Sequence, residues 1–331
     1  MRLIRGLYNL KACISDRAGS VVTVGNFDGV HLGHQALIAR TLELAREKGL
    51  PSLVILFEPQ PEEFFSHFHC PPRLTRFREK LMMFKSLGVD LVCVLRFDAN
   101  LAALSPLEFV QEILVNVCHI KALVVGDDFR FGKNGQGTVG FLKKVCADFG
   151  FVCESIEQRT SEALAQDFKV KAQRISSTLV RNALQSSNFS LAKVLLGRPF
   201  QMSGRVVHGQ KRGRTLGFPT ANIFLHRMKT PVSGVFIVEV LGVSKQPWPG
   251  IANIGLREKR GQLSPLLEVH LLDFNQMIYG AHVTVLFLKK IRPERQFESF
   301  ERLQKQVFID IDSARAYFKK HLGNHDYDPT R

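Results

Sequence analysis

The sequence predicts two domains of different class. A doubly wound parallel α/β domain is expected over residues 1–185, and a small antiparallel β-barrel with a C-terminal helix over residues 186–331. In the first part, short apolar runs alternate with segments of helical periodicity, which is typical of a parallel sheet covered by helices. After Gly197 that periodicity fades, and glycine, proline and β-branched residues punctuate short runs, as in small barrels and sandwiches. A chain of 331 residues is long enough for two separate cores.

The elements of the first domain follow from its alternating pattern. A β-branched run at residues 21–24 predicts a strand that leads into a glycine-rich turn. Apolar residues then recur at helical spacing over residues 34–48, and Gly49 is expected to end this helix. The other elements expected here are strands at residues 53–57, 91–95 and 122–125 and helices at residues 78–87 and 106–117. This order predicts a Rossmann-like sheet with helices on both faces.

The second domain is expected to begin after a junction within residues 186–200. Its short apolar runs predict barrel strands at residues 204–208, 234–241, 266–274 and 282–288. Helical spacing returns at residues 297–320 and predicts a helix that covers the barrel from outside. Asp312 is expected to cap a last short helix within this stretch.

Composition limits the classes of function. The chain carries 45 Lys and Arg against 30 Asp and Glu, and most of the excess lies after residue 185. A basic domain favours anionic partners, which could be nucleic acid, a membrane surface or polyphosphate substrates. The basic residues are scattered and lack clustered stacking aromatics, which argues against nucleic acid. The apolar runs are too short to span a bilayer, the N-terminus lacks a signal peptide, and the six cysteines form no C-x-x-C pair. We therefore expect a cytoplasmic protein with reduced thiols and no membrane or nucleic-acid partner.

The strongest chemical signal in the first domain is the turn between strand 21–24 and helix 34–48. A strand–turn–helix geometry aims backbone N–H groups and the positive end of the helix dipole at one place, where a phosphate could bind. Two imidazoles three residues apart could donate hydrogen bonds to charge that develops as pyrophosphate leaves. The candidate ATP-binding residues are Gly25, Asn26, Phe27, Asp28, Gly29, His31 and His34, and the two histidines are candidate catalytic residues.

Two other interpretations of this turn stay open. The histidines could be surface or capping residues, which would be the default for a single histidine. A zinc site with Asp28 as a third ligand is possible by residue type. It is disfavoured because the H-E-x-x-H pattern, which places two histidines on one helical face, is absent.

The segment His31-Leu32-Gly33-His34 resembles the H-x-G-H signature of the nucleotidyltransferase superfamily. Four further segments resemble the bacterial FAD synthetase family within that superfamily. They are Phe57-Glu58-Pro59-Gln60-Pro61-Glu62-Glu63-Phe64-Phe65, Arg73-Leu74-Thr75, Val125-Gly126-Asp127-Asp128-Phe129-Arg130-Phe131-Gly132 and Ile175-Ser176-Ser177-Thr178-Leu179-Val180-Arg181. The resemblance implies that Ser176, Ser177, Thr178 and Arg181 complete the ATP site, with Arg181 also catalytic. It implies a flavin site at Phe57, Pro59, Phe64, Asp128, Phe129 and Arg130.

Physical arguments support the ATP-site residues. Ser176, Ser177 and Thr178 offer hydroxyls and backbone N–H groups at a predicted helix start, although ordinary helix capping would explain them equally well. Arg181 could reach a polyphosphate with a planar fork of donors. Asp128 and its neighbours follow the strand at residues 122–125, and ligands of open α/β sheets bind beyond the carboxyl ends of strands. For Phe64, core packing is the alternative.

The second domain carries a glycine-rich basic segment that ends in Pro219-Thr220-Ala221-Asn222. Residues i and i+2 of an extended segment point to one side, so Thr220 and Asn222 could present two oxygens to Mg²⁺. The stretch from Gly204 to Asn222 resembles the G-R-x-L-G-x-P-T-A-N motif of riboflavin kinases. The resemblance implies a small β-barrel kinase without a Walker P-loop. It implies an ATP site at Gly213, Arg214, Gly217, Thr220 and Asn222.

A kinase acting on a hydroxyl needs a carboxylate to accept its proton. The segment Leu266-Leu267-Glu268-Val269-His270-Leu271-Leu272-Asp273-Phe274 resembles the E-x-H-L-x-D-F motif of the kinase family, which implies that Glu268 is the general base. Strand alternation places Glu268, His270 and Leu272 on one face. One loop departs from the family: an Arg-Pro-Thr-Phe-like continuation is expected, but the chain has Arg257-Glu258-Lys259-Arg260-Gly261.

The two motif sets together predict sequential flavin cofactor synthesis. The second domain would phosphorylate riboflavin to FMN with ATP, and the first would adenylylate FMN to FAD, with Mg²⁺ serving both and riboflavin, FMN and ATP as partners. One alternative is a chain that only converts FMN to FAD, because the altered loop impairs the kinase. Others are a nucleotidyltransferase with another substrate, which the absent K-M-S-K-S-like loop disfavours, and a nucleic-acid-binding protein.

Overall fold

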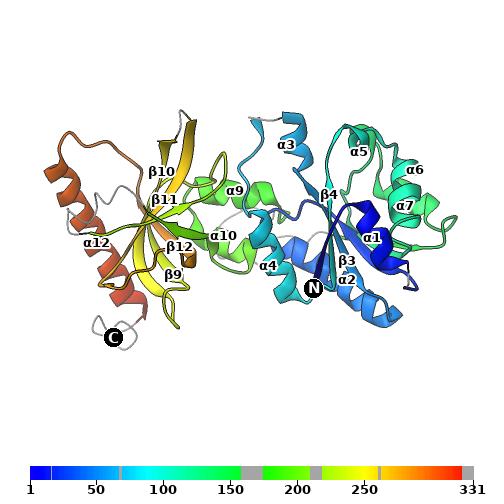
Figure 1. The fold of residues 1–331 in the computed structure, drawn as a ribbon, viewed down its shortest axis with the longest axis horizontal. Coiled ribbons are helices and arrows are strands. Elements are labelled where there is room, and N and C mark those ends of the chain that lie inside the picture. The colour runs from blue at the N-terminus through cyan, green and yellow to red at the C-terminus, as the bar shows by residue number, and fades with distance from the viewer. Residues whose placement is uncertain (16, 67–68, 158–173, 209–217, 260–261, 323–331) are drawn as a thin grey trace. The chain divides into compact units, whose positions relative to one another are not determined.

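The computed structural model describes residues 1–322 except 16, 67–68, 158–173, 209–217 and 260–261. The chain separates into two compact units, shown with their elements in Figure 1. The first comprises Met1–Pro71 and Thr75–Ser177, and the second comprises Pro72–Leu74 and Thr178–Arg331. Each unit is described by itself.

The first unit is built on a six-stranded parallel sheet with the order β1-β4-β3-β2-β5-β6. Each pair of neighbouring strands is parallel, which confirms the predicted doubly wound sheet. The strands are β1 (Arg2–Arg5), β2 (Ser20–Val24), β3 (Ser52–Glu58), β4 (Leu91–Arg96), β5 (Ile120–Gly126) and β6 (Val152–Ile156). The helices are α1 (Leu7–Ile14), α2 (Leu32–Lys48), α3 (Pro61–Ser66), α4 (Phe77–Leu87), α5 (Ala99–Ala103), α6 (Pro106–Glu108) and α7 (Val139–Val145).

Strand alternation gives this sheet two apolar faces, because successive side chains point to opposite sides. On one face, Val22 and Leu53 pack with Leu10 of α1 in one core. On the other, Val54 packs with Ile38 of α2 in a second core. The predicted helix over residues 106–117 differs from the structure: α6 is short, and a π-helix (Phe109–Val115) continues it. Gly49 ends α2 at φ 63°, as predicted, because glycine adopts the left-handed region without a Cβ clash.

The second unit contains a closed antiparallel barrel with the strand order β10-β11-β8-β7-β12-β9, which confirms the predicted barrel. Its interior is apolar: Phe236 and Phe287 meet edge to face with ring centroids 5.3 Å apart, and Leu267 and Val269 are fully buried. The strands are β7 (Phe200–Val207), β8 (Ala221–Phe224), β9 (Gly234–Leu241), β10 (Trp248–Lys259), β11 (Gln262–Leu271) and β12 (His282–Arg292). The helices are α9 (Ser177–Gln185), α10 (Phe189–Leu196) and α12 (Phe300–Leu322).

The C-terminal helix α12 packs on the outside of the barrel, as predicted. Ile311, Ala314 and Phe318 form a small core with Ile237 and Ile251 of the sheet. The expectation that Asp312 caps a separate last helix is wrong. The helix is continuous through this residue, because its apolar face runs from Ile311 to Phe318 without a break.

Several predicted bounds of the barrel strands also differ from the structure. β7 begins at Phe200, not at residue 204, and β11 begins at Gln262, not at residue 266. The strand predicted over residues 266–274 ends at Leu271, and Asp273 lies in a turn with φ 53°. The strand predicted over residues 282–288 extends to Arg292.

Across the described residues, no helix combines the length and apolar character needed to cross a membrane.

Candidate active sites in the two units

The turn between β2 and α2 lies at the carboxyl end of a central strand of the parallel sheet. Open α/β sheets bind their ligands at this edge. Its backbone is held in an unusual conformation: φ is 47° at Phe27, 85° at Gly29 and 41° at Val30. A β-branched residue at positive φ is a steric outlier, so the surroundings of Val30 must impose this conformation.

Buried side chains from other elements hold this turn in place. Thr75 donates its backbone N–H (2.9 Å) and its hydroxyl (3.2 Å) to Oδ1 of Asp28, while its Oγ1 accepts from the N–H of Gly29 (2.9 Å). Lys80 of α4 donates from Nζ to the carbonyl of Asn26 at 2.8 Å. Asp28 and Thr75 are 3% exposed, and Lys80 is 1% exposed. Asp28 was predicted to bind ATP, and in the structure its carboxylate holds the turn.

His31 and His34 lie together at the start of α2. Nδ1 of His31 accepts the N–H of His34 (3.3 Å), so His31 carries its proton on Nε2 when neutral. His31 therefore caps the helix, as one of the alternative interpretations proposed, yet it is only 5% exposed. The two rings stack with centroids 3.6 Å apart and planes 18° apart. Gly33 lies against this pair, and a Cβ there would make a tight 3.2 Å contact with the His31 ring.

The environment of His34 favours its neutral form. Burial, followed by the positive charges of His31 and Lys80, lowers the pKa of His34 well below its usual value. Its Nδ1 is buried and has no hydrogen-bond partner among the described residues. At neutral pH the imidazole of His34 is therefore uncharged.

Aromatic side chains gather at the same edge of the sheet, after β3 and β4. Phe57 lies 5.8 Å from Phe97 between ring centroids, and Phe64 of α3 lies 5.4 Å from Phe97. Phe65 joins them and is 63% exposed. Pro59 stands between β3 and α3 after a cis peptide bond. Sequence reasoning missed Phe97, although it directly follows β4 and Phe57 lies in the last two residues of β3.

The predicted residues after β5 have different surroundings from one another. Asp128 pairs with Arg174 at 2.5 Å, with both side chains about half exposed. Phe129 stacks on Phe131 with centroids 5.5 Å apart, and Arg130 is exposed. These side chains extend the polar and aromatic surface at the carboxyl edge.

The predicted serines and Arg181 are divided between the two units. Ser177 begins α9 and donates its hydroxyl to the carbonyl of Asp28 at 2.8 Å, so it supports the turn directly. Ser176 precedes it in the first unit. Thr178 and Arg181 belong to the second unit, where Nε of Arg181 donates to the carbonyl of Pro72 at 2.9 Å.

Strand register brings the predicted kinase residues together on the outer face of the barrel. Asn222 of β8 lies opposite Glu268 of β11, and Glu268 lies opposite Asn253 of β10. Directly opposite side chains on one face of antiparallel strands are about 5 Å apart at Cβ. Leu267 and Val269, which alternate with Glu268, face the buried interior.

His270 fixes the segment just before β8 that carries Thr220. Its Nδ1 lies 2.9 Å from the carbonyl of Pro219, and since a carbonyl only accepts, Nδ1 carries the proton. Burial lowers the pKa of His270, which favours this neutral tautomer. His270 thus holds the Pro219–Thr220 segment, and Glu268, two residues earlier on β11, lies on the same face opposite Asn222.

The loop that departs from the kinase family forms part of a hairpin. β10 continues to Lys259, which pairs with Gln262 of β11. Arg257 donates from its guanidinium to Oε2 of Glu268 at 3.0 Å. Arg260 and Gly261 lie outside the described residues, as do the predicted ATP-binding residues Gly213, Arg214 and Gly217.

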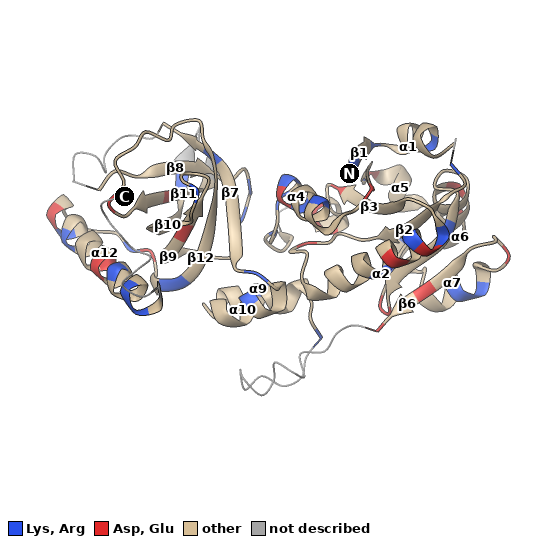
Figure 2. Ribbon diagram, turned by 90° about the horizontal axis from the view of Figure 1, so that it is seen from below, with Lys and Arg blue, Asp and Glu red and all other residues tan. Residues whose placement is uncertain are grey.

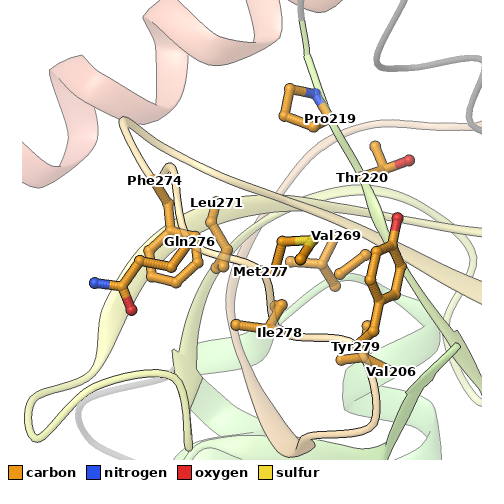
Figure 3. A pocket seen from close by; sticks show the side chains of 11 residues that line it. Val206, Pro219, Thr220, Val269, Leu271, Phe274, Gln276, Met277, Ile278 and Tyr279 are labelled. Carbon is orange, nitrogen blue, oxygen red and sulfur yellow. The ribbon is translucent and has the colours of Figure 1, made fainter. Parts of the chain in front are cut away.

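A pocket of about 100 Å³ opens beside Thr220. Figure 3 shows Thr220 and Tyr279 at one end of its lining and Phe274 and Gln276 at the other. Tyr279 also stacks on His208, with centroids 3.9 Å apart. Most of the lining residues have apolar or aromatic side chains, with Thr220, Gln276 and Tyr279 adding polar groups. Among the described residues, no group of three or more His, Cys, Asp and Glu side chains is arranged to hold a metal.

A stacked histidine pair at a strand–turn–helix junction and a carboxylate on the outer face of a closed barrel are the features expected of a chain with two ATP-dependent transferase domains. Comparison with known proteins agrees: family models for FAD synthetase and riboflavin kinase match residues 13–179 and 196–318. The chain belongs to the family of bifunctional riboflavin kinase/FMN adenylyltransferases. It has both activities, and the alternative of a single nucleotidyltransferase activity is disfavoured.

Individual relatives cover nearly the whole chain. The bifunctional riboflavin kinase/FMN adenylyltransferase of Escherichia coli (strain K12) is 47% identical over 96% of this chain and 98% of its own length. The protein of the same name from Pseudomonas fluorescens is 46% identical over 96% and 97%. A crystal structure described as a macrolide-efflux protein from Streptococcus pneumoniae has a TM-score of 0.77 and 30% identity, covering 95% of this chain and 99% of that one.

Proposed function

We propose that Glu268, Thr220 and Asn222 carry out the kinase step, and that His31 and His34, with the turn before them, carry out the adenylyl transfer. One observation carries the kinase assignment: strand register places Glu268 directly opposite Asn222, two residues from Thr220. The turn locked by Asp28, Thr75 and Lys80 supports the other assignment.

In the kinase step, the 5′-hydroxyl oxygen of riboflavin attacks the γ-phosphorus of ATP. The new bond forms as the bond from that phosphorus to the β–γ bridging oxygen breaks, which releases ADP. Glu268 accepts the hydroxyl proton, the role that a positioned carboxylate fills in phosphoryl transfer to alcohols. His270 fixes Thr220 through the Pro219 carbonyl.

Thr220 and Asn222 fit a magnesium ion by their chemistry. The amide nitrogen of Asn222 faces the carbonyl of Thr220 at 3.5 Å, which turns its Oδ1 the other way. Hydroxyl and amide oxygens beside a carboxylate are the hard ligands that Mg²⁺ prefers. Bound there, Mg²⁺ would neutralise charge on the ATP phosphates.

The apolar pocket beside Thr220 is proposed to hold the adenine ring of the kinase ATP. Thr220 lies on its lining, so a nucleotide whose phosphates meet Thr220 would place its base there. Gly213, Arg214 and Gly217 remain proposed phosphate contacts.

In the adenylyl transfer, a phosphate oxygen of FMN attacks the α-phosphorus of ATP, and pyrophosphate leaves. No proton transfer is required, so catalysis needs positioning and charge stabilisation. The turn and the start of α2 would place the phosphates at the positive end of the helix dipole, and His31 would donate from its imidazole N–H. Ser176, Ser177, Thr178 and Arg181 are proposed to complete the ATP site.

The aromatic edge of the first unit is proposed to hold the flavin. Phe57, Phe64 and Phe97 offer ring faces and edges for the isoalloxazine, with Pro59 beside them. Asp128, Phe129 and Arg130 would contact the remainder of FMN.

The protein is proposed to be cytoplasmic and to act on small molecules, not on nucleic acid or membranes. Figure 2 shows Asp and Glu alternating with Lys and Arg along α12, so this helix carries no continuous run of one charge sign that would favour a polyanion. The domain boundary is proposed near residue 185.

A chromatographic assay of purified protein with riboflavin, ATP and Mg²⁺ tests the assignments. Wild type should form FMN and then FAD, Glu268→Gln should form FAD only when FMN is supplied, and His31→Ala should stop at FMN. If Glu268→Gln still phosphorylates riboflavin at the wild-type rate, the kinase assignment is wrong.

A further inference from the structure

An ion-pair network around Arg257 lies on the face of the barrel that carries Glu268. The guanidinium of Arg257 contacts two carboxylates at once. Its Nη2 donates to Oε2 of Glu268 at 3.0 Å, and its Nη1 donates to Oε1 of Glu294 at 2.8 Å. One cation thus bridges the proposed base and a carboxylate that follows β12.

The strand pattern places these groups together. Asn253, Gly255 and Arg257 alternate along β10 and share the face of Glu268, since Asn253 is the register partner of Glu268. A Cβ on Gly255 would collide with the carboxylate of Glu294. Glycine at this position therefore leaves the space that Glu294 occupies.

The side-chain amide of Asn253 is a further hydrogen-bond partner of the Arg257 guanidinium. Both of its polar atoms are satisfied when its nitrogen donates to the carbonyl of Gly234 (3.3 Å) and its oxygen accepts from Arg257 (3.2 Å). Nη2 of Arg257 is thereby held between Asn253 and Glu268.

Glu294 is itself anchored through the end of β12. Two residues earlier, Arg292 binds the carboxylate of Asp310 of α12 through Nε (3.0 and 3.1 Å) and Nη2 (2.9 Å). Asp310 is 1% exposed and also accepts from Gln306 at 2.9 Å. A bidentate, buried guanidinium–carboxylate pair has a well-defined geometry, so it fixes where Glu294 emerges.

The exposure of the Arg257 network argues against a mainly structural role. The side chains of Arg257, Glu268 and Glu294 are 43%, 28% and 37% exposed. Ion pairs that exposed contribute little to folding stability. Among the described residues, Oε1 of Glu268 accepts no hydrogen bond, whereas Oε2 is bound by Arg257.

We propose that Arg257, held by Glu294, is a positioning residue for the kinase reaction: it fixes Oε2 of Glu268 so that Oε1 faces the hydroxyl of riboflavin. This inference rests on the proposed role of Glu268 as the base. A carboxylate fixed by one oxygen keeps the other within reach of the proton, and a misplacement of about 1 Å can cost about 100-fold in rate. Glu294 acts only through Arg257, by keeping the guanidinium from following Glu268 into other rotamers.

Steady-state kinase kinetics of Arg257→Met, Arg257→Lys, Glu294→Gln and the double variant Arg257→Met/Glu294→Gln test this. Arg257→Met should lower kcat about 10- to 100-fold, with KM for riboflavin and ATP within about 3-fold of wild type. Arg257→Lys should recover part of kcat, because an ammonium reaches one carboxylate but cannot bridge both. Glu294→Gln should lower kcat by less than Arg257→Met.

The double variant gives the sharpest result. If Glu294 acts through Arg257, the double variant should match Arg257→Met alone, whereas independent roles would multiply the two losses. Multiplying losses, or a kcat of Arg257→Met equal to wild type, would overturn the proposal. A rise in KM for ATP at unchanged kcat would show instead that Arg257 binds the phosphates.

The same chain supplies the controls. Arg302→Met removes another surface guanidinium that is paired with Glu298, and it should leave the kinase unchanged. FAD formation from FMN should be normal in every variant, and the calorimetric transition of the second unit should be retained. Glu268→Gln distinguishes failure of the proposed function from failure of this inference. If Glu268→Gln keeps kinase activity, the assignment of Glu268 as the base is wrong. If Glu268→Gln is inactive while Arg257→Met has normal kinase activity, only the positioning role of Arg257 is wrong.

Discussion

The two candidate sites are held by different kinds of interaction. In the first unit, a strained turn is fixed by nearly inaccessible side chains, with Asp28 and Thr75 3% exposed and Lys80 1% exposed. In the second unit, Asn222, Glu268 and Arg257 stand on three adjacent strands of a barrel face and meet through partly exposed contacts.

This difference follows from where each site lies in its fold. A loop at the edge of a parallel sheet has no ladder to fix its shape, so a backbone with positive φ at Phe27 and Val30 needs side-chain partners from elsewhere. On a barrel, the ladder itself sets the spacing of side chains. Changes to the scaffold of the first site should therefore affect stability and activity together, whereas changes to the second should affect chemistry with little effect on folding.

The largest expected effect is at the base of the second site. Glu268→Gln keeps the shape of the side chain and one acceptor oxygen but cannot accept the proton, so kinase kcat should fall by about 10²- to 10⁴-fold. Quantifying FMN from riboflavin measures this, and Glu298→Gln, an exposed carboxylate on the same unit, is the matched control. Unfolding of the second unit in Glu268→Gln would contradict the comparison, because that site should tolerate changes without structural loss.

The next effect is at the imidazoles of the first site. His31→Ala removes both the donor and the helix cap, and adenylyl transfer should fall by about 10²- to 10³-fold. His31→Asn keeps a capping acceptor and separates the two roles: if it restores stability but not pyrophosphate release, the imidazole is needed for chemistry. Full activity of His31→Asn would mean that capping alone matters. The kinase activity of each variant is the internal control.

A smaller effect is expected at the scaffold of the turn. Thr75→Val removes a hydrogen bond to Asp28 and one from Gly29 at nearly the same volume, and should destabilise the first unit by about 1–3 kcal/mol. Calorimetry of the full chain should show the transition of the first unit shifted and that of the second unchanged. Thr75→Ser, which keeps the hydroxyl, should lie close to wild type. A stable Thr75→Val with normal FAD synthesis would show that the turn does not depend on this lock.

The smallest effect is a pH dependence of the first unit. Burial, His31 and Lys80 hold the pKa of His34 below its usual 6.5. The unfolded chain therefore binds more protons than the folded unit between that lowered pKa and about 6.5, so the free energy of unfolding decreases as the pH falls through this window. Thermal unfolding at pH values from 8 to 5 should show this trend, and His34→Gln should weaken it. An identical trend in both proteins would assign the dependence to other groups.

The sequence determined the local features of this protein. Alternating strands and helices, the glycine that ends α2, and a barrel followed by an outer helix were all predicted, because periodicity and turn residues act over a few positions. The H-x-G-H and P-T-A-N segments are likewise contiguous, so their residue types indicated the two chemistries directly. The N-cap predicted at Asp312 was wrong because the buried face of α12 outweighs a single capping preference.

Only the tertiary structure decided which distant residues meet. Asp28 and Thr75 are 47 positions apart, Asn26 and Lys80 are 54 apart, and Arg257 and Glu294 are 37 apart. Phe97 joins Phe57 because two parallel strands end at one edge, and Glu268 faces Asn222 because of one strand register. A one-residue shift of that register would turn the carboxylate to the other face without changing any local pattern. The sequence therefore indicated which residue types take part in each site. Which of these residues lie next to one another depended on long-range packing and strand pairing.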